Sequence, residues 1–252
     1  MRLAVLSDIH GNIRALEAVR ADLLKHAPDV IVNLGDHVSG PLQASATADL
    51  LMQEKYVNIR GNHDRQLLDR PPEKMGPSDR AAFGQLDERH KAWLASLPPT
   101  LAIEPNILLC HGTFASDLEY LVENVVGDGV QLAPVDQIRE RLGHAALQLV
   151  LCGHSHLPRR LVVQGEVWIV NPGSVGLQAY DDTGTSPTHY VEVGSPHARY
   201  AIVDWDRQGC RAELITVEYD WESASKDAAL GGRPDWAYAL KTGFALRAYW
   251  TS

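Results

Sequence analysis

Residues 61–64 read Gly61-Asn62-His63-Asp64 and follow a short apolar run, Tyr56 to Ile59, that is typical of a strand. The four residues place an amide, an imidazole and a carboxylate next to one another directly after that run. Such side chains are seldom found in a packed core. The stretch therefore predicts a functional loop at the end of a strand.

Four other polar clusters follow apolar runs in the same way. They are Ser7-Asp8-Ile9-His10, Gly35-Asp36, His111-Gly112 and Gly153-His154-Ser155-His156. In open α/β sheets, ligands bind beyond the carboxyl ends of the strands. We therefore expect these clusters to meet at one edge of the fold.

The first hundred residues alternate strand-like and helix-like patterns. Strands are expected at Arg2 to Leu6, Asp29 to Leu34 and Tyr56 to Ile59, and helices at Asn12 to His26, Gln43 to Lys55, Arg65 to Asp69 and Ala82 to Leu97. The Pro-rich stretch from Pro71 to Ser78 is expected to be a loop. This order indicates parallel βαβ units.

After residue 100 the pattern changes to short apolar runs separated by turns. Strands are expected at 100–103, 107–110, 148–151, 161–163, 167–170, 200–205 and 210–217, with Val191 in a further strand, a helix at 135–142 and a hairpin turn at Asp206 to Gly209. Segments 113–134 and 181–198 are interpreted as surface loops near the site. The order predicts an α/β fold, a two-sheet β-sandwich flanked by helices in the layer order α-β-β-α.

The last part of the chain is expected to be a helical tail, 221–252, attached to a single domain, 1–220. Trp236, Leu240, Phe244 and Tyr249 suggest a helix with one apolar face, weakened by Gly243. Two interpretations stay open: the tail packs on its own domain, or it forms the interface of a homo-oligomer.

Composition limits the function classes. With 252 residues and 45% hydrophobic residues the chain can bury a sizeable core. A formal net charge of −9 disfavours binding to long nucleic acids, which depends on clustered Lys and Arg. A site with divalent cations supplies its own positive charge, so small phosphate substrates remain compatible.

The chain is expected to be cytoplasmic, without a membrane partner. No apolar run approaches the roughly 18 residues of a membrane span, and the run Leu3 to Leu6 is cut short by Asp8. Cys110, Cys152 and Cys210 each lie in an apolar run and are expected to be buried free thiols.

Carboxylates, imidazoles and an amide, without thiolates in the same loops, suit Mn, Fe or Zn, with Mn favoured. The spacing of Asp8 with His10 and of His154 with His156 suits a chelating turn. Taken alone, Asp8 has a second interpretation, as the cap of a helix. The histidine pair taken alone has a second interpretation as two surface residues. Together with Asp36, Asn62 and His111, they predict a site for two metal ions.

In this order, Asp-x-His, Gly-Asp, Gly-Asn-His-Asp, a lone His before Gly and Gly-His-x-His resemble the calcineurin-like metallophosphoesterase superfamily. The resemblance runs from residue 6 to about 175 and is strongest to the small bacterial and archaeal phosphodiesterase-like branch. That family's fold, two β-sheets between helices, agrees with the strand and helix order above.

The resemblance implies a role for each polar residue. The first ion would be bound by Asp8, His10 and His156, the second by Asn62, His111 and His154, and Asp36 would bridge both. Two ions about 3.5–4 Å apart need a shared anionic ligand, and a hydroxide between them serves as nucleophile.

His63 resembles the family's histidine beside the leaving-group oxygen, where it would act as the general acid, and Asp64 would hold its ring. The alternative is that His63 only supports a ligand. Some shorter members carry Cys at this place, so His63 favours the catalytically fuller branch.

Three further features are left with two interpretations or none. Asn171-Pro172-Gly173-Ser174 either borders the metal pocket or is a tight turn. Arg159 and Arg160 either contact a phosphate or are solvated. The histidines without spacing partners are interpreted as ordinary surface or core residues: His26, His37, His90, His144, His189 and His197.

The predicted function is a metal-dependent phosphoesterase that hydrolyses a small phosphodiester or phosphomonoester. The alternatives are a symmetrical dinucleoside tetraphosphatase, a protein phosphatase, a phosphate sensor or a catalytically silent interaction module of the same fold. The chain lacks a Gly-x-x-x-x-Gly-Lys-Ser/Thr loop and a Gly-x-Ser-x-Gly elbow, which argues against nucleotide-driven motors and serine hydrolases.

Overall fold

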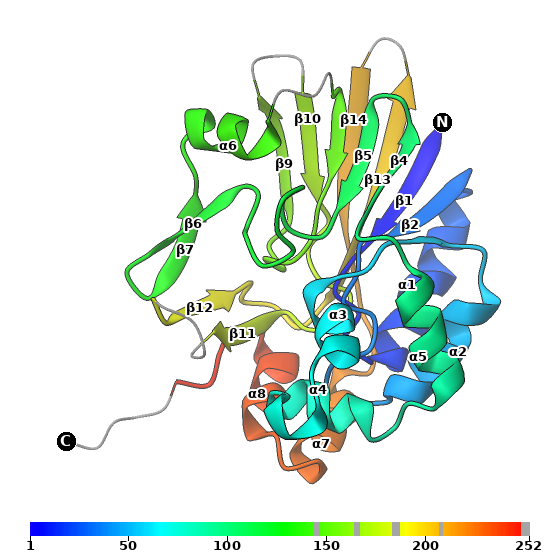
Figure 1. Ribbon diagram of the computed structural model, residues 1–252, viewed down its shortest axis with the longest axis vertical. Helices are drawn as coiled ribbons and strands as arrows, with labels where there is room; N and C mark the ends of the chain where they lie inside the picture. Colours follow the sequence, from blue (N-terminus) through cyan, green and yellow to red (C-terminus); the bar gives the residue numbers. More distant parts are fainter. Residues whose placement is uncertain (144–146, 164–166, 183–186, 207–208, 248–252) are drawn as a thin grey trace.

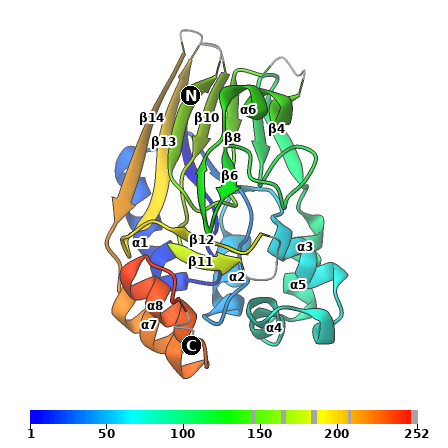
Figure 2. The same ribbon diagram turned by 90° about the vertical axis from the view of Figure 1, so that its left-hand side faces the viewer.

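Two five-stranded sheets form the centre of the computed structural model, which describes residues 1–143, 147–163, 167–182, 187–206 and 209–247 (Figures 1 and 2). The first sheet has the order β14-β13-β1-β2-β3, with β1 Arg2–Leu6, β2 Val30–Asn33, β3 Val57–Asn58, β13 Ala198–Asp206 and β14 Gly209–Val217. The second has the order β4-β5-β8-β10-β9, with β4 Thr100–Glu104, β5 Ile107–Cys110, β8 Leu149–Leu151, β9 Arg159–Val163 and β10 Val167–Asn171. The predicted fold class is confirmed.

Parallel pairing brings several strand ends to the same edge of each sheet. In the first sheet β1, β2 and β3 are parallel, and β13 and β14 add antiparallel strands. In the second, β5, β8 and β10 are parallel, and β4 and β9 pair antiparallel with their neighbours. The loops that follow these parallel strands carry the polar clusters.

The two faces of β1 show why its sequence is apolar throughout. Leu3 and Val5 face the core between the sheets, where they pack with Ile107 and Leu149 of the second sheet. Ala4 and Leu6 face the other way, toward helix α1 (Ile13–Leu23). Alternate residues point to opposite faces of a strand, so a strand covered on both sides has no polar position.

Helices cover the outer faces of both sheets. Beside the first lie α1, followed by the 3-10 turn η1 (Leu24–His26), then α2 (Ala44–Gln53) and α5 (Glu88–Ser96). The helix α3 (Asn62–Asp69) lies below the strand ends and packs against α5. On the second, α6 (Val135–Leu142) buries Ile138 and Leu142 against Val150 and Ile169. The predicted helix at 135–142 is confirmed.

The prediction of a single helix at 82–97 is wrong, because two shorter helices occupy this region. The helix α4 (Pro77–Phe83) ends at Gly84, and Asp87 begins α5 by accepting a hydrogen bond from the His90 backbone N–H at 3.0 Å. The expected loop from Pro71 to Ser78 contains a 3-10 turn, η2 (Pro72–Lys74), and the start of α4, where Pro77 suits the first helical position.

Two segments interpreted as loops contain strands instead. Within 113–134, β6 (Glu123–Val126) and β7 (Gly129–Leu132) form an antiparallel ribbon. Within 181–198, β11 (Ala179–Asp182) pairs with β12 (His189–Glu192), and residues 183–186 lie outside the described residues. These strands have four residues each and alternate polar and apolar positions too briefly to stand out. The turn expected at 206–209 also includes residues outside the description, although Asp206 pairs with Gly209.

The C-terminal part forms two helices, α7 (Trp221–Leu230) and α8 (Pro234–Thr242), which lie below β11 and β12 in both views (Figures 1 and 2). Trp236 and Leu240 are buried with Leu42 and Leu177 of the preceding chain. Gly243, with φ 73°, ends α8, so Phe244 lies beyond the expected helix. Tyr249 lies outside the described residues.

Two sequence-based expectations concern the environment of the chain. The three cysteines are buried and free, as predicted. Among the described residues, none of the helices combines the length and the apolar character needed to cross a membrane.

Candidate metal centre

The predicted ligands lie at the ends of strands from both sheets. Asp8 and His10 follow β1, Asp36 follows β2, and Asn62 begins α3 after β3. From the second sheet, His111 follows β5, while His154 and His156 follow β8. The site therefore forms only when the two sheets are packed together.

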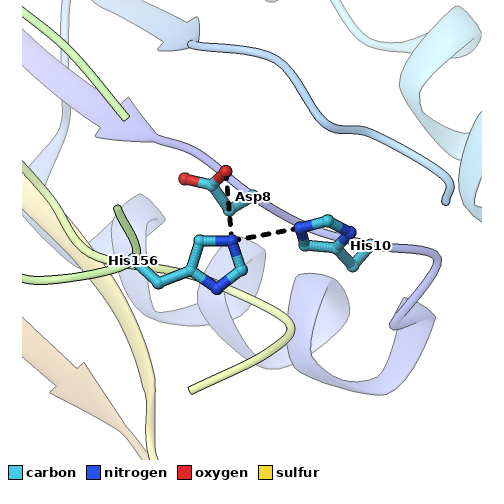
Figure 3. Close-up of side chains that lie close together, drawn as sticks. All are labelled: Asp8, His10 and His156. Carbon is cyan, nitrogen blue, oxygen red and sulfur yellow. Dashed lines mark hydrogen bonds and ion pairs between the residues drawn. The ribbon is translucent and has the colours of Figure 1, made fainter. Parts of the chain in front are cut away.

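The first group of potential ligands is Asp8, His10 and His156, all buried (Figure 3). The Nε2 atom of His156 lies 3.4 Å from Asp8 Oδ1 and 3.1 Å from His10 Nε2. The ligand atoms of the three side chains all lie within 4.8 Å of one another. One divalent ion fits such a group, because carboxylate and imidazole bind borderline ions together.

The second group is Asp36, His111 and His154, which satisfies the same 4.8 Å limit. His111 Nε2 lies 3.3 Å from Asp36 Oδ2 and 3.0 Å from Asn62 Oδ1. Asp36 Oδ2 is also 3.8 Å from His10 Nε2 of the first group. The Asp36 carboxylate thus belongs to the second group and also approaches the first.

Backbone carbonyls fix the orientation of three imidazole rings. The Nδ1 atoms of His10, His111 and His156 lie 2.8, 2.8 and 2.6 Å from the carbonyl oxygens of Ser39, Leu34 and Leu177. An Nδ1–H donated to a carbonyl leaves Nε2 as the lone-pair atom, which is the arrangement found in metal-ligating histidines. In each case Nε2 is the atom that faces the other potential ligands.

The backbone of the ligand loops is held in an unusual conformation. Five candidate ligands have φ between 53° and 67°: Asp8, His10, Asp36, His154 and His156. For a residue with a Cβ, this left-handed region costs roughly 1–2 kcal/mol. Packing alone does not select such strain, which concentrates at functional sites.

The charge distribution of the site and one buried oxygen that accepts no hydrogen bond both suit a bound cation. Asp8 Oδ1 is buried and accepts no hydrogen bond from any described residue. Burial by itself would raise the pKa of the Asp36 carboxyl, but the neighbouring His111 and His63 hold that pKa well below its usual range. Conversely, burial would lower the pKa of His111, and the charge of Asp36 raises it to about 10. These oxygen and nitrogen donors thus form an electrostatic environment that favours added positive charge.

His63 lies beside the groups and has a different partner from the one expected. Its Nδ1 lies 2.7 Å from Asp79 Oδ1, and its side chain is 33% exposed. Burial would lower its pKa, but the charge of Asp36 and the hydrogen bond with Asp79 raise it to about 9. Ser39 Oγ donates to the same Asp79 oxygen at 2.6 Å.

The predicted contact of Asp64 with His63 is wrong. The Asp64 carboxylate accepts hydrogen bonds from the backbone N–H groups of Asp36, His37 and Gly61 at 2.9, 3.0 and 3.0 Å. Its Oδ2 also lies 2.7 Å from His37 Nδ1. Successive helical residues point about 100° apart, so Asp64 cannot face the ring of its neighbour in α3. His37 is accordingly a buried partner of Asp64.

Sequence reasoning missed the residues that surround the ligands. The ring of Tyr180 lies 4.7 Å from that of His156, and the ring of Trp236 lies 5.9 Å from that of His10. Asp79 is 16 residues from its partner His63. No spacing signal connects any of these residues to the ligand motifs.

The structure assigns neighbours to the features that were left open. Asn171 Nδ2 donates to the Gly153 carbonyl at 2.8 Å, and Ser174 Oγ donates to the Asp8 carbonyl at 2.7 Å. This segment therefore supports two ligand loops. Arg159 pairs with Glu123 at 3.1 Å and Arg160 donates to the Ala212 carbonyl at 2.7 Å, so both bind protein groups.

A pocket of about 400 Å³ opens over the candidate ligands. One wall comes from α3, another from β11, and a third from α8 and the segment after it. His10, Asp36, Asn62, His154 and His156 line it together with His63.

Two face-to-face sheets with carboxylate and histidine groups at their shared edge are the features expected of a metallophosphoesterase. The chain belongs to the calcineurin-like phosphoesterase superfamily, whose domain it matches over residues 1–193. The resemblance in the motifs is thereby confirmed.

Several known proteins are similar to this chain in sequence or in fold. An uncharacterised protein of Methanocaldococcus jannaschii is 26% identical over 93% of this chain and 94% of its own. A metallophosphoesterase from Sphaerobacter thermophilus superposes with a TM-score of 0.72 at 24% identity, covering 95% of this chain and 98% of its own. A hypothetical protein from Pyrococcus horikoshii OT3 gives a TM-score of 0.72 at 19% identity, covering 97% and 99%.

Proposed function

We propose that the protein hydrolyses a small phosphodiester or phosphomonoester with two divalent ions in the candidate centre. The observation that carries this proposal is the position of Asp36, whose Oδ2 lies 3.3 Å from His111 Nε2 of its own ligand group and 3.8 Å from His10 Nε2 of the other. One ion would be held by Asp8, His10 and His156. The other would be held by Asn62, His111 and His154, and Asp36 would bind both ions. Bound ions of this kind polarise the phosphoryl group and activate water.

The side chains of the protein have two tasks in this reaction. The carboxylate of Asp36 offsets the mutual repulsion of two cations. His63 directs Nδ1 to Asp79, which leaves its Nε2 free to face the pocket. As the oxygen from water bonds to phosphorus and the bond to the leaving oxygen breaks, His63 gives its proton to that oxygen.

Metal identity and compartment are also part of the proposal. We favour Mn²⁺, since the donor atoms are oxygen and nitrogen without thiolate. The buried free thiols suit a reducing cytoplasm. A substrate that fits a pocket of about 400 Å³ favours small esters over a phosphoprotein, while a dinucleoside tetraphosphate remains the runner-up.

A panel of phosphomonoesters and phosphodiesters, assayed with Mn²⁺ and with chelator, tests the activity. We expect metal-dependent hydrolysis of at least one class. A protein that binds no metal, or that hydrolyses none of the panel, would instead be an interaction module or, with tight phosphate binding, a sensor.

Two variants separate metal binding from proton transfer. Asp36→Asn should lose the paired ions and almost all activity, because the amide cannot offset their charge. His63→Ala should keep both ions and slow turnover by about 10²–10⁴-fold, the usual size of an acid–base contribution. Metal content by elemental analysis and kcat are the measurements, and loss of metal from His63→Ala would contradict its assignment.

A further inference from the structure

Helix α3 presents a row of polar residues to the pocket. Asn62, His63 and Gln66 lie on the helix, and Arg70 follows its last residue; all four line the pocket. Residues three and four apart share a helical face. The row therefore begins at the candidate metal ligands and continues outward along one wall.

The side chain of Gln66 lines the pocket without a hydrogen-bond partner among the described residues. The residue is only 6% exposed, yet its amide atoms are not among the fully buried atoms that lack a partner. The exposed part of Gln66 is therefore its amide, which faces the pocket. An amide N–H can donate to an anionic group of a ligand that replaces water there.

Arg70 provides an available positive charge beyond Gln66. Within the described part of the chain its guanidinium has no ion pair or hydrogen bond, and the residue is exposed. The other arginine of the pocket, Arg233, is already paired with Asp235 at 2.6 Å. Arg70 lies four residues after Gln66, directly after the end of α3, and both residues line the same pocket.

The wall formed by β11 would repel a second anion. Asp181 and Asp182 from β11 line the pocket away from α3, whereas Asp235 from α8 is paired with Arg233. Like charges raise the free energy of an anion placed beside them. An anionic group of a ligand is therefore directed to the wall formed by α3.

We propose that Gln66 and Arg70 bind a second phosphate carried by the leaving group of the substrate. This inference rests on the proposed function, because it takes His63 as the residue beside the leaving oxygen. Gln66 and Arg70 lie three and seven residues after His63, which corresponds to about 4.5 and about 10.5 Å along the helix axis. The preferred substrate thus has two phosphates joined by a short linker, with the scissile one at the metal centre.

Alkanediol bisphosphates of increasing chain length, compared with alkyl monophosphates of the same length, test the subsite. If the panel shows only diester hydrolysis, the same pairs are used as methyl esters of the scissile phosphate. We expect wild-type kcat/KM to be about tenfold higher for the best bisphosphate, since a charge-assisted hydrogen bond is worth about that factor. The preference should shrink at high salt, because Arg70 is exposed.

Variants assign the preference to the two residues. Arg70→Gln should reduce the ratio of the two kcat/KM values by about tenfold, Arg70→Lys should retain part of it, and Gln66→Glu should reverse it through repulsion. Arg211→Gln, which removes an exposed arginine on β14, is the matched control and should leave the ratio unchanged.

Calorimetric binding of the same compounds with Mn²⁺ separates this inference from the proposed function. Hydrolysis with equal kcat/KM for both series, or a preference that Arg70→Gln retains, overturns the subsite alone. Absence of all hydrolysis overturns the proposed function. In that case, tighter binding of the bisphosphate that depends on Arg70 still supports the subsite. Equal binding of the bisphosphate and the monophosphate overturns the subsite.

Discussion

His63 and Asp64 are adjacent in α3 but belong to different hydrogen-bond networks. His63 is held by Asp79, whose oxygen also accepts the Ser39 hydroxyl. Asp64 instead accepts three backbone N–H groups around the loop that carries Asp36. One neighbour therefore orients a side chain in the pocket, and the other holds a ligand loop in place.

Asp79→Asn should lower kcat by about 10- to 100-fold, the usual effect of removing a carboxylate that orients a histidine in a metal site. Metal content should change little, because Asp79 contacts neither ligand group directly. Steady-state kinetics with elemental analysis measures both. An Asp79→Asn enzyme with wild-type kcat would show that the orientation of His63 does not limit turnover.

Asp64→Asn should have the opposite profile. An amide cannot accept all the hydrogen bonds that the buried carboxylate accepts, and each bond to a charged group contributes about 1.5–3 kcal/mol. We expect a loss of roughly 2–4 kcal/mol in unfolding free energy and weaker metal retention. Denaturant unfolding beside metal analysis tests this, and a fully stable, metal-replete variant would refute the scaffold role of Asp64.

At the scale of single residues, local motifs predict the candidate ligands but not the hydrogen-bond partners that come from distant parts of the chain. Polar motifs at strand ends pointed to Asp8, Asp36 and His111, because alternation and chain order are local signals. The partner of His63 could not be found in the same way, since Asp79 approaches it from a separate helix. Adjacency in the sequence suggested Asp64 as the partner of the His63 ring, and the geometry of the helix excludes this contact.

At the scale of elements, a buried ion pair joins β6 to β9. The Glu123 side chain on β6 is 1% exposed and lies 3.1 Å from Arg159 on β9, which is 31% exposed. Burial raises the pKa of Glu123, and the charge of Arg159 opposes this effect. The pair fixes the β6–β7 ribbon to the edge of the second sheet.

Arg159→Met should destabilise the protein by about 2 kcal/mol at pH 8, because it leaves a buried carboxylate without its cation. The folded pKa of Glu123 then rises further above its unfolded value. Stability from a group with a raised pKa is present at low pH and lost as pH rises through the folded pKa. The destabilisation should therefore decrease from pH 8 toward pH 5.

Arg160→Met is the matched control, because Arg160 donates to the Ala212 carbonyl and its charge acts on Cys210, whose pKa of about 11 lies above the pH range tested. Its effect on unfolding free energy should be independent of pH. Denaturant titrations at pH 8 and pH 5 measure both variants. Equal destabilisation by Arg159→Met at the two pH values would count against the ion pair.

Elements differed in how well their sequences indicated them. The strands at 2–6, 107–110 and 148–151 were predictable, since they are buried on both faces and read as continuous apolar runs. The ribbons β6–β7 and β11–β12 were not, because four-residue strands with mixed polarity resemble loops. The apolar spacing alone predicts one continuous helix at 82–97, but the helix α4 ends at Gly84.

At the scale of the whole molecule, each ligand group draws residues from both sheets. Asp8 and His10 follow a strand of the first sheet and His156 one of the second; Asp36 likewise meets His111 and His154. An ion in either group would therefore connect the two halves of the sandwich. Metal binding should stabilise the entire fold rather than one loop.

Removal of metal should lower the midpoint of a single cooperative thermal transition. A ligand at about 100 times its Kd stabilises the folded state by roughly 2.7 kcal/mol per site, so two sites contribute about 5 kcal/mol. For a chain of this size each kcal/mol corresponds to about 2–4 °C, which gives a shift of about 10–20 °C between Mn²⁺ and chelator. Calorimetry of a double variant, Asp36→Asn with His156→Gln, provides the control. Because that variant lacks a ligand in each group, chelator should hardly change its midpoint, and an undiminished shift would place the stabilising ions elsewhere in the molecule.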